Sequence, residues 1–278
     1  MGGFFYYLCH TMKELLVRTI SGAVLVAVIV ACVLLSQWSI AALALLIVAI
    51  GTYEMGRLQH VDDKWLLVLV TLMAVWVFFS AVFMLLWEHS SMFMPFLLSA
   101  VPFVMVPFLL ALFSKRYDFK TIAALTFGSF ALLSMPCALM VWTRQLFEPR
   151  MVLIVFVLLW ANDTFAYLTG RLLGKHKLFE RISPGKTIEG SIGGLVFTLA
   201  GVIVFSFFVD WLPWGMAVGM ALIAVVFGTL GDLCESMLKR QAGVKDSGNL
   251  IPGHGGVLDR FDSVLFSVPF VFVFLLLL

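Results

Sequence analysis

The sequence predicts an all-α, polytopic integral membrane protein with about nine transmembrane helices and a polar cavity that opens to the cytoplasm. Two observations predict this class. Hydrophobic residues make up 62% of the 278 residues and charged residues only 12%, well below the roughly 25% of a soluble protein. The apolar residues also gather in runs of about 17–24, long enough for a helix to cross ~30 Å of hydrocarbon.

Nine apolar runs follow one another along the chain. The first lacks the cleavage site of a signal peptide and is expected to remain as a span. The last is short, because a helix from 263 to 278 rises only ~24 Å; we expect it to tilt, or the natural chain to continue beyond Leu278. The expected spans are 19–37, 38–55, 65–87, 92–113, 121–142, 151–170, 190–210, 214–231 and 262–278.

Basic residues predict the orientation of these spans. All of the 18 lysines and arginines except Arg144 and Arg150 fall on one side, in the N-terminal segment and in alternate loops. Because basic residues favour the cytoplasmic side, we expect the N-terminus in the cytoplasm and the C-terminus outside. The net charge of +2 gives no broad basic surface for nucleic acid. The four cysteines are scattered and predict neither a disulfide framework nor a zinc site.

The cytoplasmic stretch 174–194 reads "GKHKLFERISPGKTIEGSIGG". Its Ser-Pro-Gly turn presents Lys186 and Thr187 directly before a helix that contains glycines. A lysine beside a helix N-terminus suits a phosphate group, so this loop is a candidate phosphate-binding segment. The alternative is an ordinary basic loop that follows the positive-inside rule.

Acidic residues collect in a second cytoplasmic segment, 231–263. Asp259 and Asp262 share a face at the start of the last helix, and the glycines before them let the backbone approach a ligand closely. Facing acids need positive charge between them, and their oxygen atoms favour Mg²⁺ beside phosphates. The alternative is a set of surface ion pairs, such as Asp232 with Lys239. If the eighth helix continues into this segment, one face carries Asp232, Glu235, Ser236, Lys239 and Arg240.

A third polar feature lies inside an expected span. The stretch "LLWANDTFAYLTGR" places Asp163 about a dozen residues into a hydrophobic run. An ionisable group at that depth usually faces a protein cavity or water. Tyr167 lies one turn further on, and Arg171 and Lys175 follow along the same face, so we expect this helix to open onto the same polar cavity. The alternative is a structural hydrogen-bonding site between helices.

Residues 236–262, "SMLKRQAGVKDSGNLIPGHGGVLDRFD", resemble the signature of the CTP:phosphatidate cytidylyltransferases, also called CDP-diacylglycerol synthases. That pattern runs S-x-x-K-R, four residues, K-D-x-G and then P-G-H-G-G-x-x-D-R-x-D, and every fixed element is present. The upstream stretches "ANDTFAYLTGR" and "SPGKTIEG" are also similar to motifs of this family. The resemblance covers about residues 155–263, whereas the first 150 residues match only as a run of membrane helices.

The resemblance implies transfer of CMP from CTP to phosphatidic acid, which yields CDP-diacylglycerol and pyrophosphate in phospholipid biosynthesis. It implies Mg²⁺ as the cofactor, together with an optional second cation such as K⁺. It further implies that the protein forms a homodimer in the lipid bilayer. It also implies that Asp232, Asp259 and Asp262 are the metal ligands.

The other polar residues of the three segments receive roles that suit this chemistry. Lys186, Lys239 and Arg240 join the three metal ligands as the catalytic set, because they neutralise phosphate charge. His254 by itself is better suited to hydrogen bonding within the loop than to catalysis. The substrate-binding set is Ser183, Thr187, Ser236, Lys245, Asp246, His254, Arg260 and Asp163.

Two rival functions use similar residues. A CTP-dependent lipid kinase acting on a polyprenol or phytol accepts an alcohol and releases CDP, and the full signature argues against it. An ion-coupled transporter also places acids within helices, but its polar residues are expected in both halves, whereas here they crowd into the C-terminal half.

The same distribution suggests how the chain is organised. Residues 1–150 form an N-terminal transmembrane scaffold with possible dimer contacts. Residues 151–278 form the catalytic region, with cytoplasmic loops at 171–189 and 232–262. The compact length and the lack of a soluble N-terminal extension favour a bacterial cytoplasmic (inner) membrane.

Overall fold

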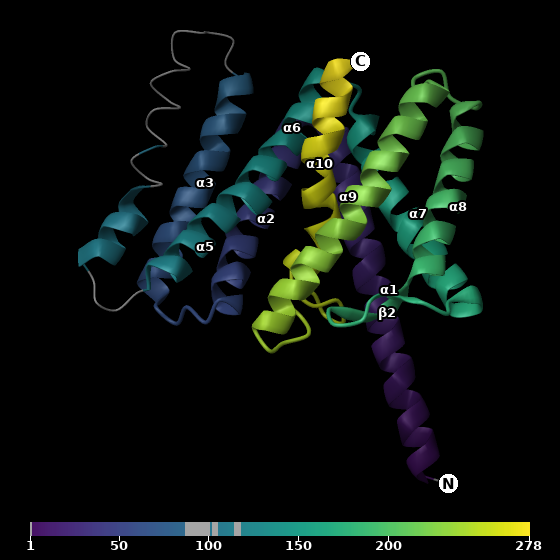
Figure 1. Ribbon diagram of the computed structural model, residues 1–278, viewed down its shortest axis with the longest axis horizontal. Helices are drawn as coiled ribbons and strands as arrows, with labels where there is room; N and C mark the ends of the chain where they lie inside the picture. Colours follow the sequence, from purple (N-terminus) through teal and green to yellow (C-terminus); the bar gives the residue numbers. More distant parts are fainter. Residues whose placement is uncertain (1, 87–100, 102–104, 114–117) are drawn as a thin grey trace.

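The computed structural model describes residues 2–86, 101, 105–113 and 118–278, and only the backbone of residues 2–15, 85 and 86. Its helices run side by side as a bundle, with a small two-stranded hairpin at the end that also holds the N-terminus (Figure 1). In chain order the elements are α1 (Gly2–Leu35), α2 (Gln37–Leu58), α3 (Lys64–Leu86), α5 (Phe119–Ser129), the π-helical turn η2 (Phe130–Ser134), α6 (Met135–Leu146), α7 (Arg150–Leu173), β1 (Lys177–Phe179), β2 (Ser183–Thr187), α8 (Ile188–Ser206), α9 (Trp214–Gln241) and α10 (Leu258–Leu277).

The structure confirms the all-α class of a polytopic membrane protein, with one small hairpin added. Within the described residues, eight segments are long and apolar enough to cross a membrane, and α5, η2 and α6 together make one of them. The expected span 92–113 lies mostly outside the described residues, although residues 105–113 are helical. Lys115 and Arg116, which contribute to the predicted orientation, also lie outside them.

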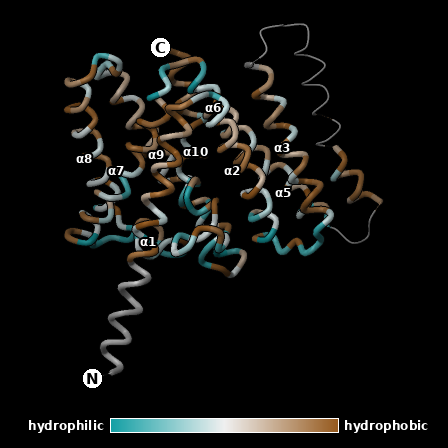
Figure 2. The backbone as a smooth tube through the Cα atoms, turned by 180° about the vertical axis from the view of Figure 1, so that it is seen from behind, coloured by the Kyte–Doolittle hydropathy of each residue, from teal (hydrophilic) through white to brown (hydrophobic). Residues whose placement is uncertain are grey.

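Hydrophobic residues follow the middle of each helix, and hydrophilic residues gather where the helices end (Figure 2). The hairpin and the loop after α9 lie at the same end of the bundle as the N-terminus, while the C-terminus lies at the opposite end (Figure 1). Two helix pairs build the part of the bundle that carries the signature: α7 packs along α8, and α9 packs along α10.

Small residues allow α7 and α8 to approach closely. A Cβ atom added to Gly190 would lie 2.7 Å from the carbonyl oxygen of Ala166 and 3.1 Å from the Cα atom of Gly170. Close backbone contact of this kind is a common way for membrane helices to associate, because lipid removes the hydrophobic drive between them.

The two last helices differ from the expected spans. Helix α9 does continue past 231, to Gln241, as the shared polar face requires. Helix α10 begins at Leu258 rather than 262, and so has 20 residues. At ~1.5 Å per residue it rises ~30 Å, enough to cross the membrane. The helix is longer than the apolar run because Asp259 and Arg260 belong to it, in agreement with the prediction that Asp259 lies at the start of the last helix.

The hairpin is the departure from a purely helical chain among the described residues. Strands β1 and β2 pair antiparallel, and the backbone N–H of Ile188 donates to the carbonyl of His176 at 3.0 Å. The side chain of Lys177 donates to the carbonyl oxygen of Pro184 at 2.7 Å. These bonds fix the segment that carries Lys186 against the first turn of α8.

Candidate functional site

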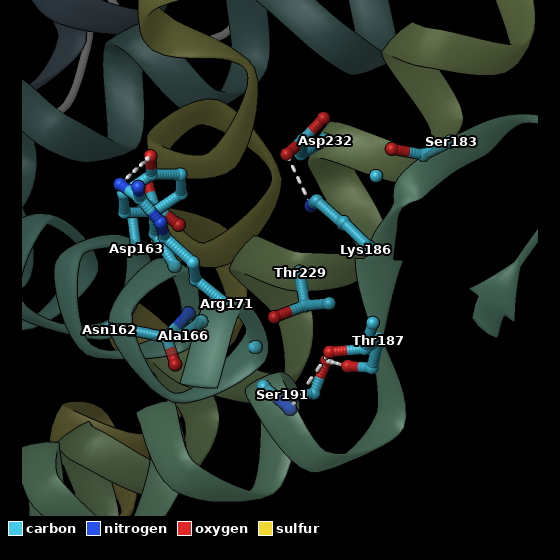
Figure 3. A pocket seen from close by; sticks show the side chains of 14 residues that line it. Asn162, Asp163, Ala166, Arg171, Ser183, Lys186, Thr187, Ser191, Thr229 and Asp232 are labelled. Carbon is cyan, nitrogen blue, oxygen red and sulfur yellow. Dashed lines mark hydrogen bonds and ion pairs between the residues drawn. The ribbon is translucent and has the colours of Figure 1, made fainter. Parts of the chain in front are cut away.

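A polar cavity of about 560 Å³ lies between α7, strand β2, the start of α8 and the middle of α9. Five predicted site residues from distant parts of the chain meet in its wall (Figure 3). They are Asp163, Ser183, Lys186, Thr187 and Asp232. The loop with Lys186 is therefore part of the cavity wall.

An ion pair crosses this cavity. Lys186 on β2 contacts the Oδ2 atom of Asp232 on α9 (Figure 3). Outside that view, Ser236 Oγ donates to Asp232 Oδ1 at 3.2 Å. Both members of the ion pair are about 30% exposed, so they remain reachable from the cavity. The pair holds a lysine, suited to phosphate, next to a carboxylate, suited to a cation.

Helix α7 forms the opposite wall. Asp163, Tyr167 and Arg171 succeed one another along it, and all three line the cavity, which confirms the predicted polar face. The prediction for Lys175 is wrong, because α7 ends at Leu173. The backbone N–H of Lys175 instead donates to Oε2 of Glu189 at 3.0 Å.

Thr187 has a structural role at the start of α8. Its Oγ1 atom accepts the backbone N–H of Gly190 at 3.1 Å, which caps one of the amides that a helix leaves unpaired at its N-terminus. Its backbone carbonyl accepts the hydroxyl of Ser191 at 3.2 Å. The capped first turn places the N-terminal end of α8 at the cavity, where helix geometry favours an anion.

A second polar cluster lies where α9 meets α10. Lys239 Nζ lies 2.5 Å from Glu235 Oε2 and 2.7 Å from Asp259 Oδ1. The side chains of these residues are at most 12% exposed. The alternative of a surface pair between Asp232 and Lys239 is wrong, since Asp232 pairs with Lys186 and Lys239 is buried between two other carboxylates.

Asp259 is the most heavily bonded acid of this cluster. Its Oδ2 atom accepts the backbone N–H of Ser247 at 2.9 Å, the hydroxyl of Ser247 at 3.0 Å and the backbone N–H of Gly256 at 2.8 Å. Gly255, with φ +84°, has a conformation that favours glycine. A Cβ atom there would lie 2.5 Å from Asp259 Oδ2. The glycines of the loop thus let the backbone close around Asp259.

Other predicted residues lie away from the cavity. The Nδ1 atom of His254 lies 2.8 Å from Ser21 Oγ on α1, and its carbonyl accepts Arg260 Nε at 2.7 Å, as expected of a hydrogen-bonding group of the loop. Arg240 donates to the carbonyl of Ile182 at 3.3 Å. Lys245 is exposed. Asp246 lines a separate cavity of about 750 Å³ beside Arg57 and His60.

Sequence reasoning missed Glu54. This residue of α2 is only 5% exposed, and its carboxylate accepts hydrogen bonds from Ser247, Val257 and Leu258. A signal was present, because an ionisable residue near the end of an apolar run satisfies the same rule that singled out Asp163. The cavity wall also includes Asn162, Ser191 and Thr229.

The carboxylates of α9 and of the first turns of α10 are of the type that suits a divalent cation. Asp232 pairs with Lys186, and Glu235 and Asp259 pair with Lys239, while Asp262 lies one turn after Asp259 on α10. The Oε1 atom of Glu235 is buried with no hydrogen-bond partner among the described residues. Within that part of the chain, however, no three His, Cys, Asp or Glu side chains are grouped closely enough to hold one ion. Carboxylate oxygens are the ligands that Mg²⁺ prefers, so the type of side chain fits this ion. In this structure lysines occupy the places beside three of these acids.

The fold and the site together define a polytopic membrane protein whose polar cavity combines Lys186, suited to phosphate, with the carboxylates of Asp163 and Asp232, and which holds a second, buried carboxylate cluster around Lys239. The sequence profile described as "Cytidylyltransferase family" matches residues 16–278. The chain therefore belongs to the cytidylyltransferase family.

Curated relatives are similar over part of their length. A phosphatidate cytidylyltransferase of Staphylococcus haemolyticus (strain JCSC1435) is 52% identical over 126 residues, which is 45% of this chain and 48% of the relative. The protein of the same name from Staphylococcus aureus (strain COL) is 50% identical over 126 residues, with the same shares. That from Staphylococcus epidermidis (strain ATCC 35984) is 47% identical over 132 residues, 46% of this chain and 49% of the relative. The matched part spans about half the length of these relatives.

Proposed function

We propose that this chain is a CTP:phosphatidate cytidylyltransferase, which transfers CMP from CTP to phosphatidic acid and releases pyrophosphate. The observation that carries the proposal is the cavity in which Lys186, Asp232 and Asp163 meet, in a chain of the cytidylyltransferase family. The relatives that match about half of this chain carry the name phosphatidate cytidylyltransferase, which agrees with this reaction.

The proposed reaction is an in-line displacement at phosphorus. An oxygen of the phosphatidate phosphate forms a bond to the α-phosphorus of CTP, and the bond from that phosphorus to the α,β-bridging oxygen breaks. A phosphate monoester has a second pKa near ~6, so the attacking oxygen is already largely ionised at neutral pH. The chief demands on the protein are therefore positioning and relief of repulsion between two anions.

The residues of the cavity suit those demands. Lys186 lies in the cavity and would neutralise a phosphate, with Arg171 on the opposite wall. Ser183 and Thr187 offer hydroxyl groups beside it. Lys239, near the end of α9, forms an ion pair that holds Asp259 of α10 in place. The lipid tails would stay in the bilayer while the headgroup enters between the helix ends.

Mg²⁺ would be held by Asp232, Asp259 and Asp262, whose carboxylates supply the oxygen ligands that this ion prefers. When bound, it would offset the negative charge of the triphosphate at the reacting phosphorus. A second cation such as K⁺ would take up part of the remaining carboxylate charge.

The proposal includes the orientation of the chain in the membrane, its assembly and the membrane that holds it. The distribution of lysine and arginine supports a cytoplasmic N-terminus, a C-terminus outside and an active site that faces the cytosol, where CTP is found. The chain would work as a homodimer in a bacterial cytoplasmic membrane.

The position of the transferred label tests the reaction directly. Purified protein in detergent micelles is given phosphatidic acid, Mg²⁺ and CTP labelled at either the α- or the γ-phosphorus. Cytidylyl transfer moves only the α label into lipid. A lipid kinase given an alcohol lipid instead would move only the γ label, and a transporter would move neither; either result would overturn the proposal.

A further inference from the structure

We propose that Glu54 is a positioning residue for the loop 242–257, which joins α9 to α10, and that it acts on the reaction through Ser247 and the first turn of α10. The inference rests on the proposed function for its catalytic meaning. Its structural basis is separate: Glu54 belongs to α2, in the half of the chain that carries none of the predicted site residues, and lies 193 positions before Ser247 in the sequence.

The carboxylate of Glu54 caps α10. Its Oε1 atom accepts the backbone N–H of Val257 at 3.0 Å, and its Oε2 atom accepts the backbone N–H of Leu258 at 2.9 Å. The first amides of a helix have no acceptor within the helix, and the residue at the cap position, Val257, offers no side-chain hydrogen bond. Glu54 therefore supplies from another helix the cap that the local sequence lacks.

The same carboxylate also contacts the loop before α10. The hydroxyl of Ser247 lies 3.0 Å from Glu54 Oε2 and 3.0 Å from Asp259 Oδ2. A hydroxyl has one proton to donate, so these two carboxylates share it. Ser247 is 8% exposed, and its backbone N–H is already bound to Asp259. Glu54 thus reaches the predicted metal ligand Asp259 through one intervening side chain.

Two glycines of the loop fit around Glu54. A Cβ atom at Gly248 would lie 2.6 Å from Glu54 Oε1, and one at Gly256 would lie 2.6 Å from both carboxylate oxygens. A buried carboxylate is costly unless hydrogen bonds satisfy it. Here three donors from the loop and from α10 converge on it, so loop, helix and acid are fixed together. The spatial relation of Asp259 to Ser247 depends on that arrangement.

Glu54→Gln tests the inference with little change of shape. A glutamine presents an NH₂ group in place of one oxygen, which sets a donor against Val257, or against Leu258 and Ser247. The matched control is Thr52→Val on the same helix: Thr52 is fully buried, and its hydroxyl has no hydrogen-bond partner among the described residues.

Two readouts are measured on the purified, full-length protein in detergent. Hydrogen exchange followed by mass spectrometry reports the amides of peptides covering 247–258. Steady-state kinetics with CTP, phosphatidic acid and Mg²⁺ report kcat and KM separately. We expect Glu54→Gln to speed exchange in 247–258 at least tenfold and to lower kcat about 10–100-fold, with little change in the KM for CTP. Thr52→Val leaves both unchanged.

Each outcome decides a different point. Unchanged exchange in Glu54→Gln overturns the inference. Faster exchange with wild-type kcat shows a purely structural cap and also overturns the positioning role. Partial recovery of kcat in Glu54→Asp, which keeps the charge, supports it. If the wild-type protein transfers no label from CTP, the proposed function is wrong, and the exchange result still decides whether Glu54 holds the loop.

Discussion

Lys239 Nζ lies 2.7 Å from Asp259 Oδ1 and joins the end of α9 to the first turn of α10. The same ammonium group lies 2.5 Å from Glu235 Oε2 in the preceding turn of its own helix. One lysine thus balances two buried carboxylates. Since the other acid of α9, Asp232, is balanced by Lys186 from the hairpin, each lysine holds a different part of the site.

Replacing Lys239 by methionine should destabilise the protein as well as inactivate it. The change leaves Glu235 and Asp259 buried without their cation, and removal of one partner from a buried ion pair costs about 3–5 kcal/mol. The unfolding temperature in detergent micelles measures the effect. Lys64→Met, at an exposed lysine at the start of α3, is the control. Equal unfolding temperatures for the two variants would contradict the account of the buried cluster.

Replacing Lys186 by glutamine should impair the reaction more than the fold. Lys186 is partly exposed to the cavity, so we expect kcat/KM to fall about 100-fold, as when one charge-stabilising donor is lost. Lys175→Gln, an exposed lysine two residues before the hairpin that does not line the cavity, should keep wild-type kinetics. The assignment of Lys186 fails if both glutamine variants turn over at the wild-type rate.

Replacing Gly190 by alanine should separate α7 from α8. The new methyl group would meet the carbonyl of Ala166 at 2.7 Å, and overpacking of this kind costs about 1–3 kcal/mol. Gly201→Ala on the same helix has open space around its Cβ position and should be neutral or stabilising by up to ~1 kcal/mol. Thermal unfolding in micelles ranks the two variants. A Gly190→Ala protein as stable as Gly201→Ala would contradict the close helix contact.

The membrane helices could be predicted because each one is a long apolar run, and hydrogen bonding within the helix is then the way to satisfy its backbone in lipid. The meeting of Asp163, Lys186 and Asp232 could also be predicted, since an ionisable residue inside an apolar run faces a polar cavity and the segments with Lys186 and Asp232 were expected at the same side of the membrane. Which lysine pairs with which carboxylate could not be predicted. Whether Lys239 meets Asp232 or Asp259 depends on the path of the loop between α9 and α10.

Two further features were not predicted from the sequence pattern. The first residue of α10 was not, because hydropathy marks where apolar residues begin, whereas the helix begins where Glu54 caps Leu258. Glu54 was overlooked although it lies near the end of an apolar run, and its partners could not be predicted because they lie in a different half of the chain. Contacts of this kind depend on tertiary packing, which periodicity does not encode.

The reaction is tested most directly by measuring both products in one assay, in wild-type protein and in Asp259→Asn. We predict that wild-type protein with phosphatidic acid, CTP and Mg²⁺ forms lipid-soluble cytidine label and pyrophosphate in equal amounts, and that EDTA abolishes both. Asp259→Asn should form neither while keeping the gel-filtration profile of the wild type. Mg²⁺-dependent product formation by Asp259→Asn, or wild-type protein that leaves CTP intact, would contradict the account.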